Sequence, residues 1–520
     1  MGTTDATPHV RRRRERVIAS VLLAAIMLAS LWLRWPGLTQ GGFASHDVGG
    51  ILYNAMLLAR GELPYVADIE LKAPGSFYLA WVFAGDRGTD IARLQVWANL
   101  WAIAGQLALA SIAWRAAGPR VAVVAAGLLA LVDAHLDSMD ANYVTWAQLP
   151  QILAMGWALA AARCHGPARA LGFVIAGALG GFAAMVKQPS GVVLLALSLA
   201  ALPGLWSSDW RQCVRTQLAI AGGAIAVHVP LVLHYLAAGE LSALLSSYPV
   251  NRWGLSYVTA GGREHAWPMP VEGALATSYF LALPLVPAAF AAAATRGRGS
   301  AARTLGWPVA IWLLCTVAQA WVGARFYKGY FLAAAAPAAL LAALPWGVFG
   351  EALALSRRAR AALLLPMLLL GVRQLRIDRD TRFDRSRPHD AGARAIAKHL
   401  QGVMQPGDRI WVWGWHLWDL YALLDATAPT RIYKSLGLIE PPNDDTWRLP
   451  ATPLRFVDGD YPQQLVAELR ADPPAVIVLG STVPQRDFVA LRELLREQYV
   501  RDGGVKMGKL ELWRRKDRAG

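Results

Sequence analysis

Charged residues are scarce in this sequence: only 17% of its 520 residues are Asp, Glu, Lys or Arg, whereas 55% are hydrophobic. So little charge, together with repeated apolar runs, excludes an ordinary soluble protein. Many of these runs approach the roughly 20 residues that an α-helix needs to cross a bilayer. The composition therefore predicts a polytopic α-helical membrane protein.

Acidic residues are fewer than basic ones, 36 against 51, which gives a formal net charge of +15. Such an excess also occurs in proteins that bind nucleic acid. Here, however, Lys and Arg stand in short clusters between apolar runs, an arrangement typical of the cytoplasmic loops of membrane proteins. We therefore expect the lipid bilayer as a partner and no nucleic acid.

Cysteine is almost absent, with only Cys164, Cys213 and Cys315. Two of them fall in predicted cytoplasmic connections and the third in a predicted span, so no disulfide framework is available to the exported parts. The sequence also lacks CxxC, GxGxxG and Walker motifs, and nothing marks a nucleotide site.

The N-terminus joins RRRRER at 11–16 to an apolar run at 17–33. A cleaved signal peptide has the same two parts, but this run is long and residues 31–36 offer no small-residue cleavage site. We interpret residues 1–16 as a basic cytoplasmic N-terminus and the run as an uncleaved first span.

The apolar runs predict about eleven spans within a transmembrane domain at 17–373. When the connections between these spans are numbered from the N-terminus, all the even-numbered ones carry Arg. This predicts that the N-terminus lies inside and the C-terminal part outside a bacterial-type cytoplasmic membrane. The predicted spans are 17–35, 91–114, 120–134, 146–162, 169–186, 190–205, 216–237, 271–294, 305–322, 329–347 and 360–372.

Residues 374–520 alternate between helical and strand patterns and lack long apolar runs. They predict an extracytoplasmic α/β domain. Helices are expected in 392–404, in 416–426, in the first part of 465–480 and in 491–500. Strands are expected in 409–415, in 430–436 (TRIYKSL), at the end of 465–480 and, as an edge strand, in 509–516 (KLELWRRK).

The first loop, residues 36–90, is polar and acidic although it lies between two apolar runs. Ionisable groups held against a bilayer are costly, so a cluster of them is a hypothesis for a functional site. A carboxylate there suits proton abstraction from a hydroxyl, and Lys or Arg at the same depth suits a phosphate at headgroup level. The candidates on the predicted outer side are Asp47, Asp68, Glu70, Lys72, Lys187, Arg325 and Lys328.

These residue types match the needs of sugar transfer from a lipid phosphate to a hydroxyl, because a base activates the acceptor and cations stabilise the departing phosphate. Four segments carry a resemblance in matching order: 46–81 with G-x-x-P-Y and K-x-P, 177–195 with K-Q-P, the aromatic 323–343, and 408–433 with V-W-G-W and T-R. Together they resemble the polyprenyl-phosphate-sugar-dependent GT-C glycosyltransferases of the protein mannosyltransferase-like group, glycosyltransferase family 39.

The resemblance implies a GT-C fold and an inverting hexosyl- or pentosyltransferase. Its donor would be a polyprenyl-phosphate-linked sugar and its acceptor a hydroxyl of a glycan, lipid or protein. The resemblance implies Asp47 as the catalytic base and Asp68 and Glu70 as groups that order the acceptor or an ion. Contacts to the donor phosphate are implied for Lys72, Lys187, Arg325 and Lys328.

The sequence departs from the family pattern at Val48, where the family often has Glu. No metal ligands are assigned and no cofactor is firmly implied, so dependence on a divalent cation stays open. The identity of the sugar, the acceptor and the lipid length are not specified either.

Simpler interpretations stay open for each residue. Asp47 is also a favoured helix N-cap, Asp68 and Glu70 suit a solvated loop, and Lys187 suits a lysine that extends to the interface. Basic residues beside a span, such as Arg325 and Lys328, are ordinary. For the whole chain, the alternative function is a transporter or flippase of a lipid-linked sugar, although internal repeats typical of transporters are missing. A membrane-anchored sensor would need fewer spans and no buried carboxylates.

Overall fold

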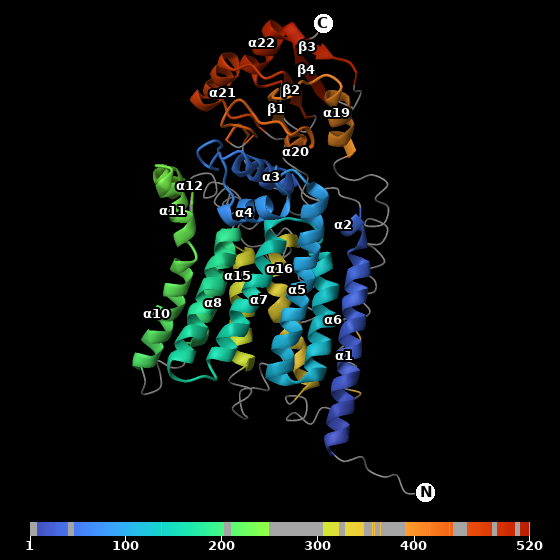
Figure 1. Ribbon diagram of the computed structural model, residues 1–520, viewed down its shortest axis with the longest axis vertical. Coiled ribbons are helices and arrows are strands. Elements are labelled where there is room, and N and C mark those ends of the chain that lie inside the picture. Colours follow the sequence, from blue (N-terminus) through green and yellow to red (C-terminus); the bar gives the residue numbers. More distant parts are fainter. Residues whose placement is uncertain are drawn as a thin grey trace.

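A bundle of helices carries a smaller C-terminal domain at one end, and the first described helix begins at the opposite end (Figure 1). The structure is a computed structural model. It describes residues 8–39, 46–136, 138–201, 210–248, 305–321, 328–347, 356, 358, 365, 391–414, 417–435, 437–439, 455–480, 486–504 and 510–518.

Among the described residues, five helical segments are long and apolar enough to cross a membrane: Arg12–Leu33, Ile91–Ala117, Gly166–Val186, Trp210–Ala237 and Gly329–Trp346. The described bundle helices are α1 (Pro8–Leu33), α5 (Ile91–Ala117), α6 (Pro119–His135), α7 (Tyr143–Ala161), α8 (Gly166–Val186), η1 (Gln188–Gly191), α9 (Val192–Ala201), α10 (Trp210–Ala226), α11 (Val229–Ala237), α12 (Leu241–Ser247), α15 (Trp307–Trp321), η4 (Lys328–Phe331), α16 (Leu332–Ala343) and η5 (Leu344–Trp346).

The predicted spans follow these helices closely where the chain is described. The span predicted at 271–294 lies outside the described residues, as does 360–372 apart from residue 365. The remaining predictions coincide with helices, but α6, α7, α9 and α15 are not among the five segments that meet both criteria of length and hydropathy. The number of spans therefore stays a prediction.

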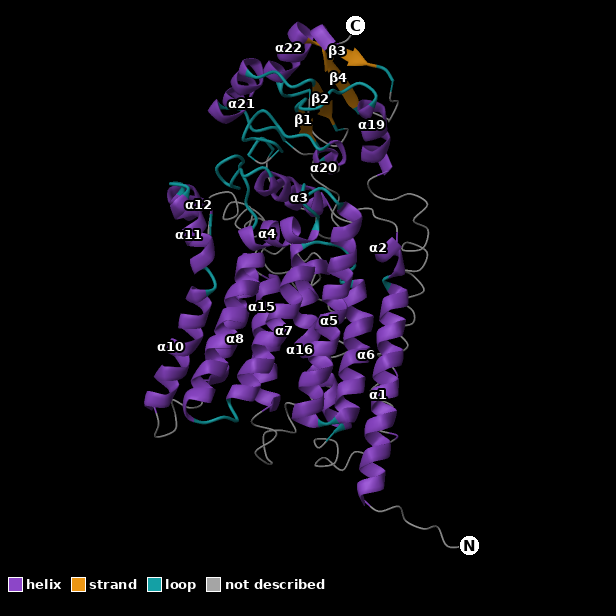
Figure 2. Cartoon of the chain, viewed as in Figure 1, coloured by secondary structure: helices purple, strands orange, loops and turns teal. Residues whose placement is uncertain are grey.

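The first loop forms short helices that lie between the bundle and the C-terminal domain (Figure 2). They are α2 (Trp35–Thr39), α3 (His46–Ala59) and α4 (Pro74–Phe83). After its first turn α3 is apolar on most sides, with Asn54 as the polar exception, which is typical of a helix that is covered all round. Val48, Ile51 and Leu52 are fully buried, in a hydrophobic core that α3 shares with the C-terminal domain.

A buried arginine joins α1 to the neighbouring helices. Arg34 follows α1, and its Nη2 lies 3.1 Å from Asp133 Oδ2 of α6. Its Nη1 also donates to the carbonyl oxygen of Ser138 over 2.6 Å. Arg34 thereby connects the end of α1 to α6 and to Ser138. Removal of either Arg34 or Asp133 would leave the other as an unpaired buried charge.

The C-terminal domain contains a four-stranded sheet in the order β1-β2-β4-β3. β1 and β2 are parallel, whereas β4 is antiparallel to both β2 and β3. Its elements are α19 (Ala391–Gln401), β1 (Ile410–Trp413), α20 (Asp419–Leu424), α21 (Asp460–Ala471), β2 (Val476–Leu479), α22 (Val489–Gln498), β3 (Tyr499–Asp502), β4 (Glu511–Arg515) and η7 (Lys516–Arg518).

Two strand predictions are wrong. KLELWRRK was expected to form an edge strand; it contains β4, but β4 lies between β2 and β3, and the charge of Glu511 is paired with Arg492 of α22. The described residues 430–435 of TRIYKSL form no strand. Their polar groups bond to the first loop instead, where Ile69 N donates to the carbonyl oxygen of Arg431 over 2.9 Å. The domain boundary predicted at 373 lies outside the described residues.

Candidate active site

Asp47 lies in the first turn of α3, where the positive end of the helix dipole favours an acidic side chain. Its two oxygens contact side chains from two other parts of the chain. Oδ1 lies 3.0 Å from Lys72 Nζ, and Oδ2 accepts a hydrogen bond of 3.2 Å from Asn142 Nδ2. The Asp47 side chain is 35% exposed, so a carboxylate anchored on both oxygens still reaches the surface.

Lys72 is the cation that faces this carboxylate, and it is itself buried. Burial alone lowers the pKa of a lysine, but Asp47 and Glu70 outweigh it and raise the pKa of Lys72 above its usual value. Lys72 therefore keeps its positive charge at neutral pH.

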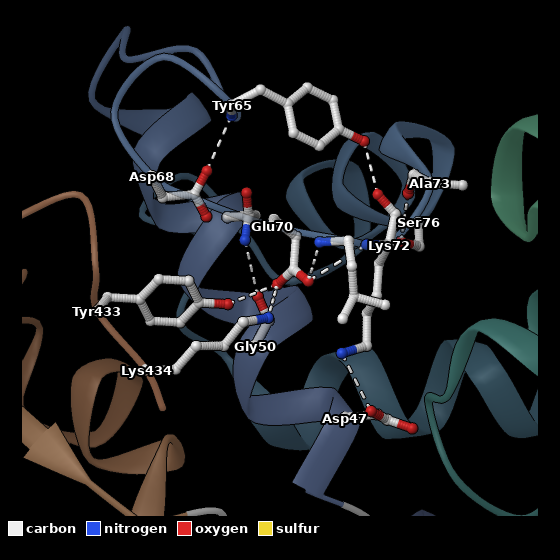
Figure 3. Close-up of polar contacts among 12 residues, drawn as sticks. Asp47, Gly50, Tyr65, Asp68, Glu70, Lys72, Ala73, Ser76, Tyr433 and Lys434 are labelled. Atoms are coloured by element: carbon white, nitrogen blue, oxygen red, sulfur yellow. Dashed lines mark hydrogen bonds and ion pairs between the residues drawn. The ribbon is translucent and has the colours of Figure 1, made fainter. Parts of the chain in front are cut away.

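Glu70 is buried between the first loop and the C-terminal domain (Figure 3). Its Oε1 accepts hydrogen bonds from the backbone N–H of Leu71 at 2.7 Å and of Lys72 at 3.2 Å. Its Oε2 accepts one from the Tyr433 hydroxyl at 2.6 Å and pairs with the ammonium group of Lys434. Burial opposes ionisation, but the charges of Lys434 and Lys72 prevail and lower the pKa of Glu70 to about 2.

Asp68 is fully buried beside Glu70 and accepts a hydrogen bond of 2.8 Å from the backbone N–H of Tyr65. Burial, followed by repulsion from Glu70, raises the pKa of Asp68 to about 7. The pKa values of Asp68 and Glu70 therefore differ sharply although the two residues are only two positions apart. Neither lies in a solvated loop, which was the simpler interpretation.

Lys187 follows α8, and its side chain is only 7% exposed. Its Nζ lies 5.2 Å from the ring centroid of Tyr143, at the start of α7, and 4.7 Å from that of Tyr330 in η4. Burial lowers the pKa of Lys187 to about 7, against an opposing effect of Asp47. A lysine held between two aromatic faces is not the extended interfacial lysine of the simpler interpretation.

The segments that carry Lys72 and Lys187 are joined directly. Gln188 Nε2 donates to the carbonyl oxygen of Leu71 over 3.1 Å. Of the predicted site residues, the structure therefore brings together Asp47, Asp68, Glu70, Lys72 and Lys187. Arg325 lies outside the described residues, and for Lys328 the structure describes the backbone at the start of η4 but not the side chain.

Sequence reasoning missed Asn142, Tyr433 and Lys434. Asn142 is the N-cap of α7 and lies in a segment already predicted to be on the outer side. Tyr433 and Lys434 are more than 360 residues away from Glu70 in the sequence. The one available signal was the two basic residues in TRIYKSL, which was assigned to a strand.

A metal site does not emerge from the described parts of the chain. No group of three or more His, Cys, Asp or Glu side chains there is arranged to hold an ion. The carboxylate of Glu70 already accepts from four donors, which matches the roughly four lone-pair positions of such a group.

The bundle, the helical first loop and the C-terminal domain define a membrane protein with the GT-C glycosyltransferase fold. No protein-family model matches the sequence, and no curated protein matches it. Among solved structures, the chain is similar to ArnT from Cupriavidus metallidurans bound to undecaprenyl phosphate. The TM-score is 0.60 at 15% identity, over 94% of this chain and 97% of that one.

Two other solved structures share the fold. The oligosaccharyltransferase of Archaeoglobus fulgidus in the apo form gives a TM-score of 0.55 at 14% identity, over 88% of this chain and 69% of that one. The arabinofuranosyltransferase AftD from Mycobacteria gives 0.51 at 15% identity, over 95% of this chain and 39% of that one. The expected GT-C fold is thus confirmed.

Proposed function

We propose that this protein is an inverting membrane glycosyltransferase that takes a sugar from a polyprenyl phosphate and transfers it to a hydroxyl acceptor. The main support is the contact of 3.0 Å between Asp47 and Lys72, with Lys187 buried close by. This arrangement puts a partly exposed base beside two shielded cations. The similarity to ArnT, whose solved structure contains undecaprenyl phosphate, supports the lipid class of the donor.

The chemical step follows from these groups. The acceptor oxygen attacks the anomeric carbon from the face opposite the phosphate, and Asp47 accepts the hydroxyl proton. The bond between the anomeric carbon and the phosphate oxygen breaks, and its electron pair leaves with polyprenyl phosphate. Lys72 and Lys187 stabilise the charge that develops on that phosphate, and their burial makes the interaction stronger than it would be in water. The proton on Asp47 then passes to water.

The orientation of the chain supports a reaction outside the cytoplasm. The N-terminus and the α5–α6 and α7–α8 connections lie at one end of the bundle, and the site lies at the other, beneath the C-terminal domain (Figure 1). Arg115, Arg120, Arg163 and Arg169 flank those two connections. Positive charge is retained in the cytoplasm, so we assign the C-terminal domain, predicted at 374–520, and the site to the outer face of the cytoplasmic membrane.

The test uses purified protein in lipid nanodiscs with sugar-labelled polyprenyl phosphates and a panel of glycan, lipid and peptide hydroxyl acceptors. We expect release of polyprenyl phosphate together with a labelled acceptor. Movement of the intact donor across a proteoliposome membrane without such release would establish lipid-linked sugar transport and overturn the proposal. Mass spectrometry of envelope glycans and glycoproteins after gene deletion would then identify the sugar and the acceptor together.

A further inference from the structure

The segment 430–435 packs in the C-terminal domain, where Ile432 O accepts from Trp411 Nε1 over 2.8 Å, and it also bonds to the first loop. Arg431 Nη2 donates to the carbonyl oxygen of Tyr65 over 2.9 Å, and the carbonyl oxygen of Arg431 accepts from Ile69 N. Tyr433 and Lys434 both bond to Glu70. These contacts form a cross-domain clamp. By this term we mean Arg431, Tyr433 and Lys434 of the C-terminal domain, which bond to the first loop.

Glu70 connects this clamp to Lys72. One carboxylate oxygen is held by the C-terminal domain, and the other holds the backbone N–H groups of Leu71 and Lys72. The turn that aims the Lys72 side chain at Asp47 is therefore fixed by a carboxylate whose position depends on the other domain (Figure 3).

Tyr65 shows that the first loop is held under strain at this point. Its φ of 66° is uncommon for a bulky residue and costs free energy, so it persists only where surrounding contacts enforce it. Those contacts are the hydrogen bonds of its N–H to Asp68, its carbonyl oxygen to Arg431 and its hydroxyl to the carbonyl oxygen of Lys72 at 2.6 Å. The clamp and Lys72 thus bond to the same strained residue.

Lys434 acts through Glu70 and has no open approach to a substrate. Its side chain is 3% exposed, and its Nζ lies 5.4 Å from the ring centroid of Trp418 while it pairs with Glu70. If Lys434 were removed, Glu70 would be a buried carboxylate stabilised by the charge of Lys72, the second cation that lowers its pKa. Lys72 would then be attracted away from Asp47, because a buried charge must be paired.

We propose that Lys434 is a positioning residue for the lipid phosphate: through Glu70, the C-terminal domain holds Lys72 in place to bind that phosphate. This inference rests on the proposed function and assigns the C-terminal domain a part in the site itself. It accounts for a buried ion pair across two domains that the chemical step does not use.

The test compares Lys434→Met with wild type for the dissociation constant of undecaprenyl phosphate and for kcat and KM of the sugar donor. We expect the variant to bind undecaprenyl phosphate at least tenfold more weakly and to lose kcat/KM by at least tenfold. Glu70→Gln in the Lys434→Met background removes the competing charge, while its side-chain oxygen still accepts from the backbone. The double variant should therefore bind better than Lys434→Met alone, a non-additivity that general destabilisation does not produce.

Two further variants separate positioning from folding. Tyr433→Phe keeps the stacking on Tyr53, at 4.0 Å between ring centroids, and removes one donor to Glu70, so we expect a smaller loss of affinity in a well-folded protein. Arg60→Met is the matched control, because Arg60 also joins the first loop to the C-terminal domain, through Asp425, without contacting Glu70. It should bind undecaprenyl phosphate as wild type does.

The outcomes distinguish this inference from the proposed function. Unchanged affinity and turnover in Lys434→Met, with an active wild type, would overturn the positioning role and leave the proposed function intact. Equal losses in Lys434→Met and Arg60→Met would also overturn it, because domain docking in general would then be the cause. A wild type that binds undecaprenyl phosphate in a Lys434-dependent way but transfers no sugar would support the positioning role and contradict the proposed reaction.

Discussion

Asn142 Nδ2 donates to Asp47 Oδ2, on the oxygen opposite the one that faces Lys72. The amide is oriented by its own helix, because Asn142 Oδ1 caps α7 by accepting from Val144 N over 3.3 Å. Asp47 is therefore held on both sides by groups that are themselves fixed. A base anchored in this way presents its carboxylate in one orientation to an incoming hydroxyl.

We expect Asp47→Asn to reduce kcat by roughly 10²- to 10⁴-fold, the contribution typical of a general base. The amide has nearly the same shape but does not accept the hydroxyl proton, so the thermal unfolding midpoint in detergent should change little. Turnover is measured as release of polyprenyl phosphate. Asp425→Asn is the matched control, since Asp425 is a carboxylate paired with Arg60 and Arg87 away from the site. Full activity of Asp47→Asn would refute the assignment of the base.

The affinity for the donor should depend on pH through Lys187. With a pKa of about 7 in the free protein, Lys187 is charged below pH 7 and loses its proton above it. A sugar phosphodiester carries one fixed negative charge, so its dissociation constant should be constant below pH 7 and rise by up to about tenfold per pH unit above it. Titration calorimetry between pH 6 and pH 7.5 measures this.

Lys187→Arg provides the control for this pH dependence. Arg stays charged throughout the range, so the variant should bind the donor with little change between pH 6 and pH 7.5, below the pKa of about 8 to which burial lowers Lys434. Lys187→Met should bind weakly at every pH. A wild-type profile that is flat, or one that persists in Lys187→Arg, would show that Lys187 does not contact the phosphate.

Gly49 should tolerate no side chain. A Cβ at this position would come within 2.8 Å of the backbone nitrogen of Asp419 and 3.0 Å of the backbone of Trp418, where α20 packs on α3. Gly49→Ala should therefore lower stability by about 1 to 3 kcal/mol through overpacking, and lower turnover as the C-terminal domain shifts. Gly222→Ala in α10 is the control, because a Cβ there meets no atom within 4 Å. Equal unfolding midpoints of the two variants would contradict this interpretation.

Asp68 should make the protein less stable as the pH rises towards neutral. Its pKa is about 7 in the folded protein and 3.8 ordinarily, so its favourable contribution is complete below about pH 4 and is lost as pH rises through 7. Asp68→Asn mimics the protonated form and should lessen the fall in unfolding midpoint between pH 5 and pH 7.5. Parallel curves for wild type and variant would show that Asp68 titrates normally. Glu70, with a pKa of about 2, does not contribute in this window.

The fold was largely predictable where one physical rule dominates. Spans are set by long apolar runs, and these coincide with helices such as α5 and α8. Asp47 and Lys72 were predictable as site candidates because acidic and basic residues are costly at the membrane and so stand out between apolar runs. Their contact of 3.0 Å became apparent only in the structure.

The rest depends on contacts between parts of the sequence that are far apart. TRIYKSL has the β-branched and aromatic residues of a strand, but its Tyr433 and Lys434 bond to the buried Glu70, and such tertiary contacts can override β-propensity. Lys187 lies near the predicted interface, yet its burial between Tyr143 and Tyr330 requires three separate segments to converge. No local pattern encodes such convergence.

The Glu70–Lys434 pair also limits which C-terminal domains could replace this one by recombination. A C-terminal domain taken from another GT-C protein would have to bring both a lysine and a tyrosine to Glu70, and leave room over Gly49 and Gly50. Without them, recombination would leave an unpaired buried carboxylate beside the lysine that faces the base. We therefore expect the two parts of the chain to be exchangeable only together, although each has its own architecture.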